Sequence, residues 1–131
     1  MSTSAQYAST VTSAAVQVTT ANTARDGTGT LGTTLITVLT AGASGTRIDD
    51  IYMVGTGTTT AGVIRLFVFD GTNTCLLSET LVTAVTPSTT VQVWSNTLLS
   101  QAIVLKTGYA LRATTNNTET FNIIVTRAGD F

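Results

Sequence analysis

Short apolar runs alternate with clusters of Gly, Thr and Asn at intervals of about ten residues along most of this chain of 131 residues. This rhythm is typical of strands joined by turns and leaves little room for a helix. β-Branched residues dominate, threonine alone makes up about a quarter of the chain, and helix-forming residues are scarce. The length suits one domain around one core. The pattern therefore predicts an all-β, single-domain sandwich or barrel.

Period-two alternation supports this prediction where it can be tested, as in Phe121–Val125, whose alternate residues are apolar. We expect eight or nine strands, preceded by an extended N-terminal segment. The expected strands are Ala15–Thr20, Thr34–Leu39, Arg47–Val54, Val63–Phe69, Cys75–Thr83, Val91–Asn96, Ile103–Leu105, Tyr109–Thr114 and Phe121–Arg127.

One expected strand, Val63–Phe69, has two apolar faces. Ile64 and Leu66 belong to the first face, and Phe67 belongs to the second together with the charged Arg65. An apolar face that contains a charge indicates cover by another strand, a loop or a partner. The sequence does not decide among these three.

Charge and composition exclude several classes of protein. The formal net charge is −1, so there is no basic field to hold nucleic acid or anionic lipid. The absence of histidine excludes Ser-His-Asp catalysis and imidazole metal ligation. No apolar run is long enough for a membrane helix, and the N-terminus lacks the features of a signal peptide. We therefore expect a protein that is made in the cytoplasm. The single cysteine, Cys75, stands beside two leucines and is expected to be a small buried residue.

The carboxylates offer two candidate chemistries. Asp49 and Asp50 are adjacent, but neighbours on a strand point to opposite faces, so they can converge on one substrate bond only if a bulge intervenes. A hydrolase would need Asp49 with Glu79 or Asp70 as a partner. A calcium site could draw on Asp49, Asp70 and Asn73, although no dense Asp/Asn loop is present. The simpler interpretation pairs these acids with arginines, and we expect no enzyme activity, metal or cofactor.

Two further motifs have a simple structural explanation. The segment Gly27–Gly32 matches GxGxxG, but a β-branched strand follows where a dinucleotide site needs a helix, so this segment is expected to form turns. Trp94 and Tyr109, with Tyr52, could form a platform for stacking sugars. Aromatic residues make up only 6% of the chain, so the core is expected to need most of them.

The mean hydropathy of +0.34 is high for a chain with no membrane segment and only 10% charged residues. A small monomer with such a surface would expose apolar patches and self-associate. Symmetric partners would cover that surface, because charge is depleted from the centres of interfaces. This composition, without catalytic residues, favours a structural subunit of a homo-oligomer.

Three segments carry a resemblance to a known group of proteins. They are Arg47–Asp49 after the Gly-rich turn in TAGASGTRIDDI, the strand and hairpin Arg65–Gly71, and LKTGYAL over Leu105–Leu111. In these segments and in the order of its turns, the chain resembles small virion proteins of tailed bacteriophages from about Ala21 onward.

The resemblance implies a jelly-roll-like antiparallel β-sandwich over residues 21–131. The small and polar residues of 1–20 are expected to form an extended arm, which can include a first strand, with a frayed terminus as the alternative. The resemblance also implies a capsid decoration (cement) protein, a homotrimer favoured, which binds the major capsid protein and sits on the virion surface. The alternative is a head-fibre, neck or tail module that binds host glycan. The expected interface residues are Ser2, Thr3, Tyr7, Arg25, Asp26, Arg47 and Asp49.

Overall fold

The computed structural model describes residues 9–131, which contain nine β-strands and no helix. The all-β prediction is confirmed. The strands are β1 (Thr10–Val18), β2 (Ile36–Thr40), β3 (Thr46–Gly55), β4 (Gly62–Phe69), β5 (Thr74–Val82), β6 (Ser95–Leu98), β7 (Ile103–Leu105), β8 (Ala110–Thr115) and β9 (Phe121–Asp130).

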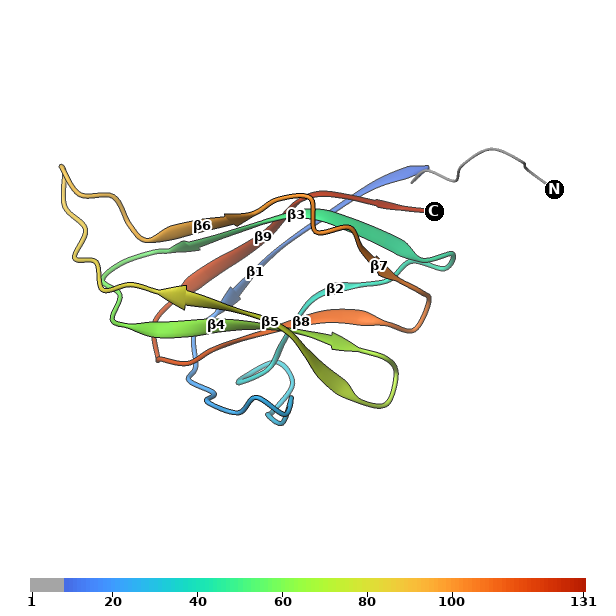
Figure 1. Cartoon of the computed structure of the whole chain (residues 1–131), viewed down its shortest axis with the longest axis horizontal. Coiled ribbons are helices and arrows are strands. Elements are labelled where there is room, and N and C mark those ends of the chain that lie inside the picture. Colours follow the sequence, from blue (N-terminus) through green and yellow to red (C-terminus); the bar gives the residue numbers. More distant parts are fainter. Residues whose placement is uncertain (1–8) are drawn as a thin grey trace.

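Two antiparallel sheets form a sandwich (Figure 1). Sheet A has the order β1-β9-β3-β6, and β7 pairs with the other half of β3, so β6 and β7 act as one interrupted edge strand. Sheet B has the order β2-β8-β4-β5. With β6 and β7 counted as one strand, consecutive strands alternate between the sheets except for the β4–β5 hairpin within sheet B, in the manner of a jelly roll. The expected antiparallel, jelly-roll-like sandwich is what the structure shows.

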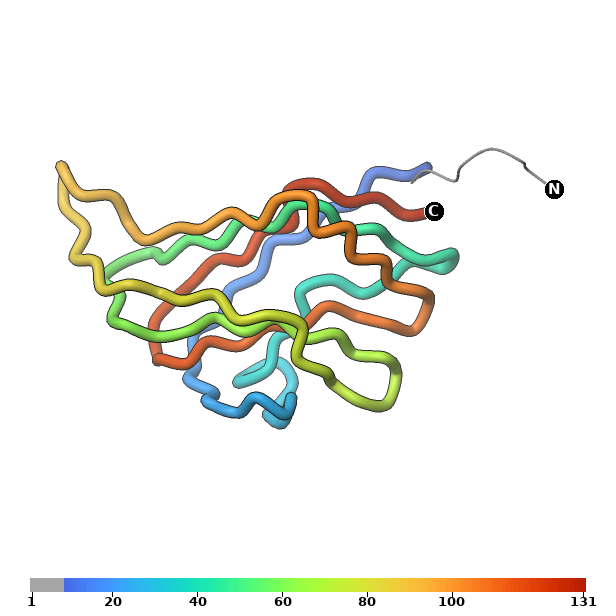
Figure 2. The backbone as a smooth tube through the Cα atoms, in the orientation of Figure 1, coloured from blue at the N-terminus to red at the C-terminus, as the bar shows by residue number. Residues whose placement is uncertain are grey.

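The first and the last strand, β1 and β9, both lie in sheet A. β1 pairs with β9 from Thr10 opposite Asp130 to Val18 opposite Phe121, so the start of β1 and the end of the chain run side by side (Figure 2). Part of the expected N-terminal arm is therefore a strand of the chain's own sheet. The expected interface residues Ser2, Thr3 and Tyr7 lie outside the described residues.

The strand expected over Val91–Asn96 was placed too early. The chain turns at Ser88, whose backbone N–H donates to the carbonyl of Val91 and whose hydroxyl accepts from the N–H of Val91. β6 begins only at Ser95. The alternation of apolar residues in this segment does not reflect a strand, because Trp94 fills the core from a connection that leads into β6.

The main core lies between the two sheets and is built from alternate residues of the strands. Trp94 packs edge-to-face on Phe121, with ring centroids 5.6 Å apart and an interplanar angle of 88°. The other buried members of this core are Val18, Val38, Ile48, Ile51, Met53, Ile64, Leu66, Val82, Leu105, Leu111, Ala113, Ile123 and Val125.

A second buried layer lies on the outer face of sheet B. Phe67 has no exposed surface and Arg65 has 2%, yet neither belongs to the core between the sheets. The segment 19–35 covers this face: it runs below β4 and β8 in Figure 1 and pairs with the end of β8 where Asn22 N–H donates to the carbonyl of Thr115. The sequence allowed another strand, a loop or a partner as the cover, and in the structure the cover is a loop.

An ion-pair cluster holds the covering segment in place. Glu79 on β5 accepts a hydrogen bond of 2.8 Å from Nε of the buried Arg65 and another of 2.8 Å from Nε of Arg25 in segment 19–35. The Arg65 guanidinium also reaches the carbonyl of Asn22 at 3.4 Å. Glu79 thus neutralises a buried cation and joins the segment to the edge strand of sheet B.

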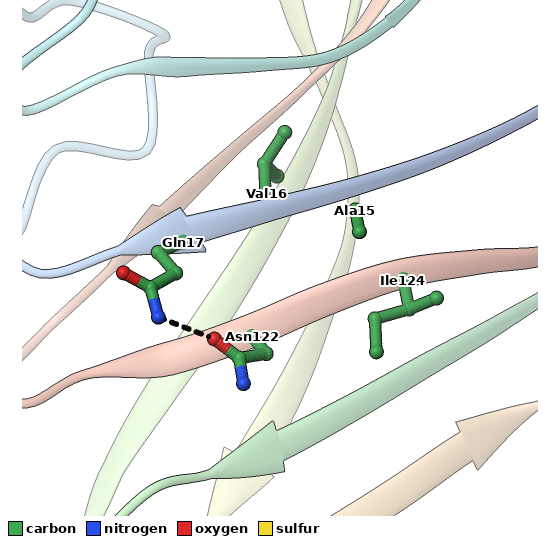
Figure 3. Close-up of a pocket in the computed structure, with 5 residues that line it drawn as sticks. All are labelled: Ala15, Val16, Gln17, Asn122 and Ile124. Atoms are coloured by element: carbon green, nitrogen blue, oxygen red, sulfur yellow. Dashed lines mark hydrogen bonds between the residues drawn. The ribbon is translucent and has the colours of Figure 1, made fainter.

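The outer face of sheet A has no such cover among residues 9–131. Across it, Ala15, Ile124, Tyr52 and Thr97 lie opposite one another on β1, β9, β3 and β6. A shallow hollow of about 290 Å³ lies over Ala15 and Ile124, beside the hydrogen bond of 2.9 Å from Gln17 to Asn122 (Figure 3). This bare face stands in contrast to the covered face of sheet B.

Candidate functional site

A β-bulge in β3 places two adjacent carboxylates on the same face. Ile48 and Ile51 are both completely buried in the core, and the pairing of β3 with β9 shifts register between them. The two residues between them, Asp49 and Asp50, therefore both stand on the outer side of sheet A. The expectation of opposite faces is corrected here, because the bulge it named as the exception is present.

Each of the two carboxylates is held by an arginine. Asp49 Oδ1 lies 2.9 Å from Nε of Arg47, two residues earlier on β3. Asp50 Oδ2 lies 3.0 Å from Nε of Arg127, its opposite residue on β9. Both arginines are largely exposed, whereas both carboxylates are mostly shielded. The result is a charge-balanced cluster of two cations and two anions.

The same two acids hold the loop that interrupts the edge strand. Between β6 and β7, Ser100 and Ala102 both have φ +51°, a conformation that L-residues rarely adopt. The N–H of Ser100 donates to Asp50 Oδ1 at 2.9 Å, and the N–H of Gln101 donates to the carbonyl of Asp49 at 2.8 Å. These bonds fix a strained turn against the bulge.

Exposed apolar side chains flank the charged cluster. Leu99, at the start of the strained loop, is 63% exposed, and Val104, directly opposite Arg47 on β7, is 62% exposed. Arginine beside apolar side chains is a composition enriched in protein interfaces. We call this set the sheet A patch; its members are Arg47, Asp49, Asp50, Leu99, Val104 and Arg127.

The expected interface residues fall into separate places. Arg47 and Asp49 meet in the sheet A patch, whereas Arg25 and Asp26 lie in segment 19–35, which covers sheet B. Asp26 accepts hydrogen bonds from the hydroxyl and the N–H of Thr28, which hold the pKa of its carboxyl below the ordinary value. Arg25 and Asp26 thus stabilise their own segment and are not part of the patch.

The residues expected for a hydrolase or for a calcium site do not lie close together. Asp70 accepts from the backbone N–H groups of Asn73 and Thr72 in the β4–β5 hairpin, which lowers its pKa. Glu79, on β5, is bound to Arg65 of β4 and to Arg25. Asp49 lies in the other sheet. Across residues 9–131 no three His, Cys, Asp or Glu side chains gather as a metal site would require. The calcium site built from Asp49, Asp70 and Asn73 is therefore not formed.

The three aromatic residues considered for sugar stacking have different environments. Trp94 is buried in the core, and Tyr109 is half-buried with Nζ of Lys106 5.7 Å from its ring centroid. Tyr52 lines a groove of about 370 Å³ on the outer face of sheet A, beside Pro87 and Gln92. Only Tyr52 is placed where a ligand could reach its ring within an open groove.

Cys75 is exposed, so its expected burial was wrong. It lies on β5, an edge strand that has a neighbour on one side only. The bulge in β3 and the strained loop were not predicted. The apolar spacing of Ile48 and Ile51, which are three residues apart where regular alternation requires two or four, could have indicated the bulge, whereas no pattern in the sequence indicates the loop.

Comparison with protein-family models, with curated proteins and with solved structures finds no match for the chain. Among the described residues, no helix is long and apolar enough to cross a membrane.

Proposed function

We propose that this protein is a structural subunit that acts by binding neighbours in a larger assembly and does not act as an enzyme. The observation that supports this is the sheet A patch, where two ion pairs and two exposed apolar side chains lie on a face that residues 9–131 leave uncovered. The chain provides its own cover for the equivalent face of sheet B. Outward-facing apolar groups beside fixed charges suit a specific contact with another protein.

The assembly we propose is the virion of a tailed bacteriophage. The resemblance in Arg47–Asp49, Arg65–Gly71 and Leu105–Leu111 motivates this proposal, and the jelly-roll-like strand order is compatible with it. In this role the protein decorates the head as a homo-oligomer, a trimer in the form that the resemblance implies, and binds the major capsid protein. Many equivalent contacts over a shell retain the subunit even when each is weak.

Gold-labelled antibodies raised against the recombinant protein test this proposal on intact virions of the phage that encodes the chain. We expect label on the head surface, and less label when Arg47 is replaced by Glu, since the reversal places three acids against one arginine in the patch. Virions that carry no label, although the protein is present in the infected cells, would overturn the proposal.

The groove at Tyr52 favours a second candidate, a module of the virion that binds host glycan. Tyr52, Pro87 and Gln92 line the groove, and no charged residue is among the residues that do so. A neutral sugar could stack on the tyrosine ring and bond to the amide. A glycan array separates the candidates: binding that is lost in Tyr52→Ala and kept in Tyr109→Ala supports the glycan module, and an array without signal removes it.

A further inference from the structure

β5 is an edge strand with an unusually apolar exposed surface. Leu81 is 75% exposed, Leu77 is 42% exposed and Leu76 is 40% exposed, so three of the eight large exposed hydrophobic residues of the described chain lie on this one strand. An edge strand of this kind is a template for pairing with another strand, and proteins normally protect such edges.

The other edges of the sandwich are protected in recognisable ways. β2 has only five residues and lies beside β1. The edge formed by β6 and β7 is broken by the strained loop at Ser100. β1 consists mainly of small and polar residues, with Val11 as its one large exposed hydrophobic residue. β5 is therefore the edge that most needs a cover.

The backbone of β5 has free hydrogen-bonding capacity. β5 pairs only with β4, and no further hydrogen bond reaches the backbone of residues 74–82 from any other part of the described chain. The outward N–H and C=O groups can form hydrogen bonds with the C=O and N–H groups of another extended strand in place of water. The bulge at Leu77 disturbs the first half of β5, so the regular half, Ser78–Val82, is the part that can accept such a strand.

The charges on β5 indicate which kind of strand could pair with it. The only ionisable group on Ser78–Val82 is Glu79, and Arg65 and Arg25 both neutralise it from within the same chain. Pairing of two copies of β5 therefore does not bring two free carboxylates together, which would disfavour it. Antiparallel pairing of identical strands also satisfies twofold symmetry, the commonest symmetry of homo-oligomers.

We propose that two copies of this chain associate through Ser78–Val82 of β5, paired antiparallel about a twofold axis. The two four-stranded B sheets then become one continuous sheet of eight strands, and Leu81 of each copy is covered by the other. The contact is smaller than a standard interface of about 800 Å² per partner, so the dimer is weak, with a Kd of about 1 µM or higher. The contact uses neither the sheet A patch nor the groove at Tyr52, so it is independent of the proposed function.

Sedimentation of the full chain from about 1 µM to about 1 mM tests the proposal. We expect the fraction of dimer to rise with concentration. Antiparallel pairing of Ser78–Val82 places Leu81 of one copy opposite Glu79 of the other, so Leu81→Glu is expected to raise the dimer Kd at least about tenfold, because like charges directly opposite each other disfavour the pair. Val11→Glu is the control, since Val11 is an exposed hydrophobic residue on β1, which belongs to the other sheet. The control is expected to keep the dimer Kd of the unmodified chain.

Hydrogen exchange locates the contact independently of any variant. Amides in 78–82 are expected to gain protection as concentration rises, whereas amides in 95–105 are expected to stay unchanged. A chain that is monomeric over the whole range overturns the proposal. So does a dimer that Leu81→Glu leaves intact, or concentration-dependent protection that is absent from β5. The result on virion labelling is unaffected by any of these outcomes.

Discussion

Replacing Phe67 with Ala tests whether segment 19–35 really makes a second core on the outer face of sheet B. The ring of Phe67 is completely buried, although its face of β4 points away from the core between the sheets. A buried aromatic ring removes about 150–200 Å² of surface from water. At about 25 cal/mol per Å², this burial contributes about 4–5 kcal/mol. Without the cover, most of the ring would contact water and little of this free energy would be lost on substitution.

We therefore expect Phe67→Ala to lower the free energy of unfolding by about 3–5 kcal/mol, the range for removal of a buried aromatic side chain. Urea denaturation followed by the fluorescence of the single tryptophan, Trp94, measures this change, since Trp94 lies in the other core. The control is Leu81→Ala, which removes an exposed side chain and is expected to change the free energy by less than about 0.5 kcal/mol. A cost below about 1 kcal/mol for Phe67→Ala would refute the second core.

Three further predictions concern single side chains. The hydrogen bond from Arg25 holds the pKa of Glu79 below its ordinary value of 4.5. The stability that ionised Glu79 contributes to the fold is therefore present above pH 4.5 and is lost as the pH falls through the lower pKa of the folded state. Glu79→Gln is expected to have a lower free energy of unfolding in urea than the unmodified chain at pH 7, and the difference between the two is expected to narrow in acid. Gly27→Ala is expected to cost about 1–3 kcal/mol in the same assay, because Gly27 has φ +82° and a Cβ there would lie 2.5 Å from the carbonyl oxygen of Thr74. Asp50→Ala, which removes the acceptor of the Ser100 N–H, is expected to speed amide exchange in the loop between β6 and β7 while the exchange of β8 amides stays unchanged; equal exchange in that loop would show that the carboxylate does not hold it.

The regular strands could be predicted from the sequence because burial on one face alone sets a period of two. β9 illustrates this: Phe121 and Ile123 enter the core and Asn122 does not, as their spacing requires. The need for a cover over Phe67 could be predicted as well, because an apolar residue beside a buried charge cannot face water. Which segment provides that cover could not, since it depends on where the chain returns after β1.

The bulge of the candidate site and the exposure of Cys75 were not predicted from the sequence, for a physical reason in each case. A bulge adds one residue to a strand, so every later side chain points to the face opposite the one that regular alternation predicts. The sequence of the pair Asp49–Asp50 itself does not show whether a bulge is present. The position of a strand within its sheet is likewise decided by long-range pairing. Cys75 is hydrophobic enough for a core, but the edge position of its strand leaves it exposed.

The loop over Arg65 and Phe67 makes the outer faces of the two sheets different from each other. A partner that approached sheet B from outside would first have to displace a segment tied down by Glu79, whereas one that approached sheet A would displace no part of residues 9–131. A neighbour stacked on sheet B would therefore have to compensate for the ion pairs it broke, and a neighbour stacked on sheet A would not.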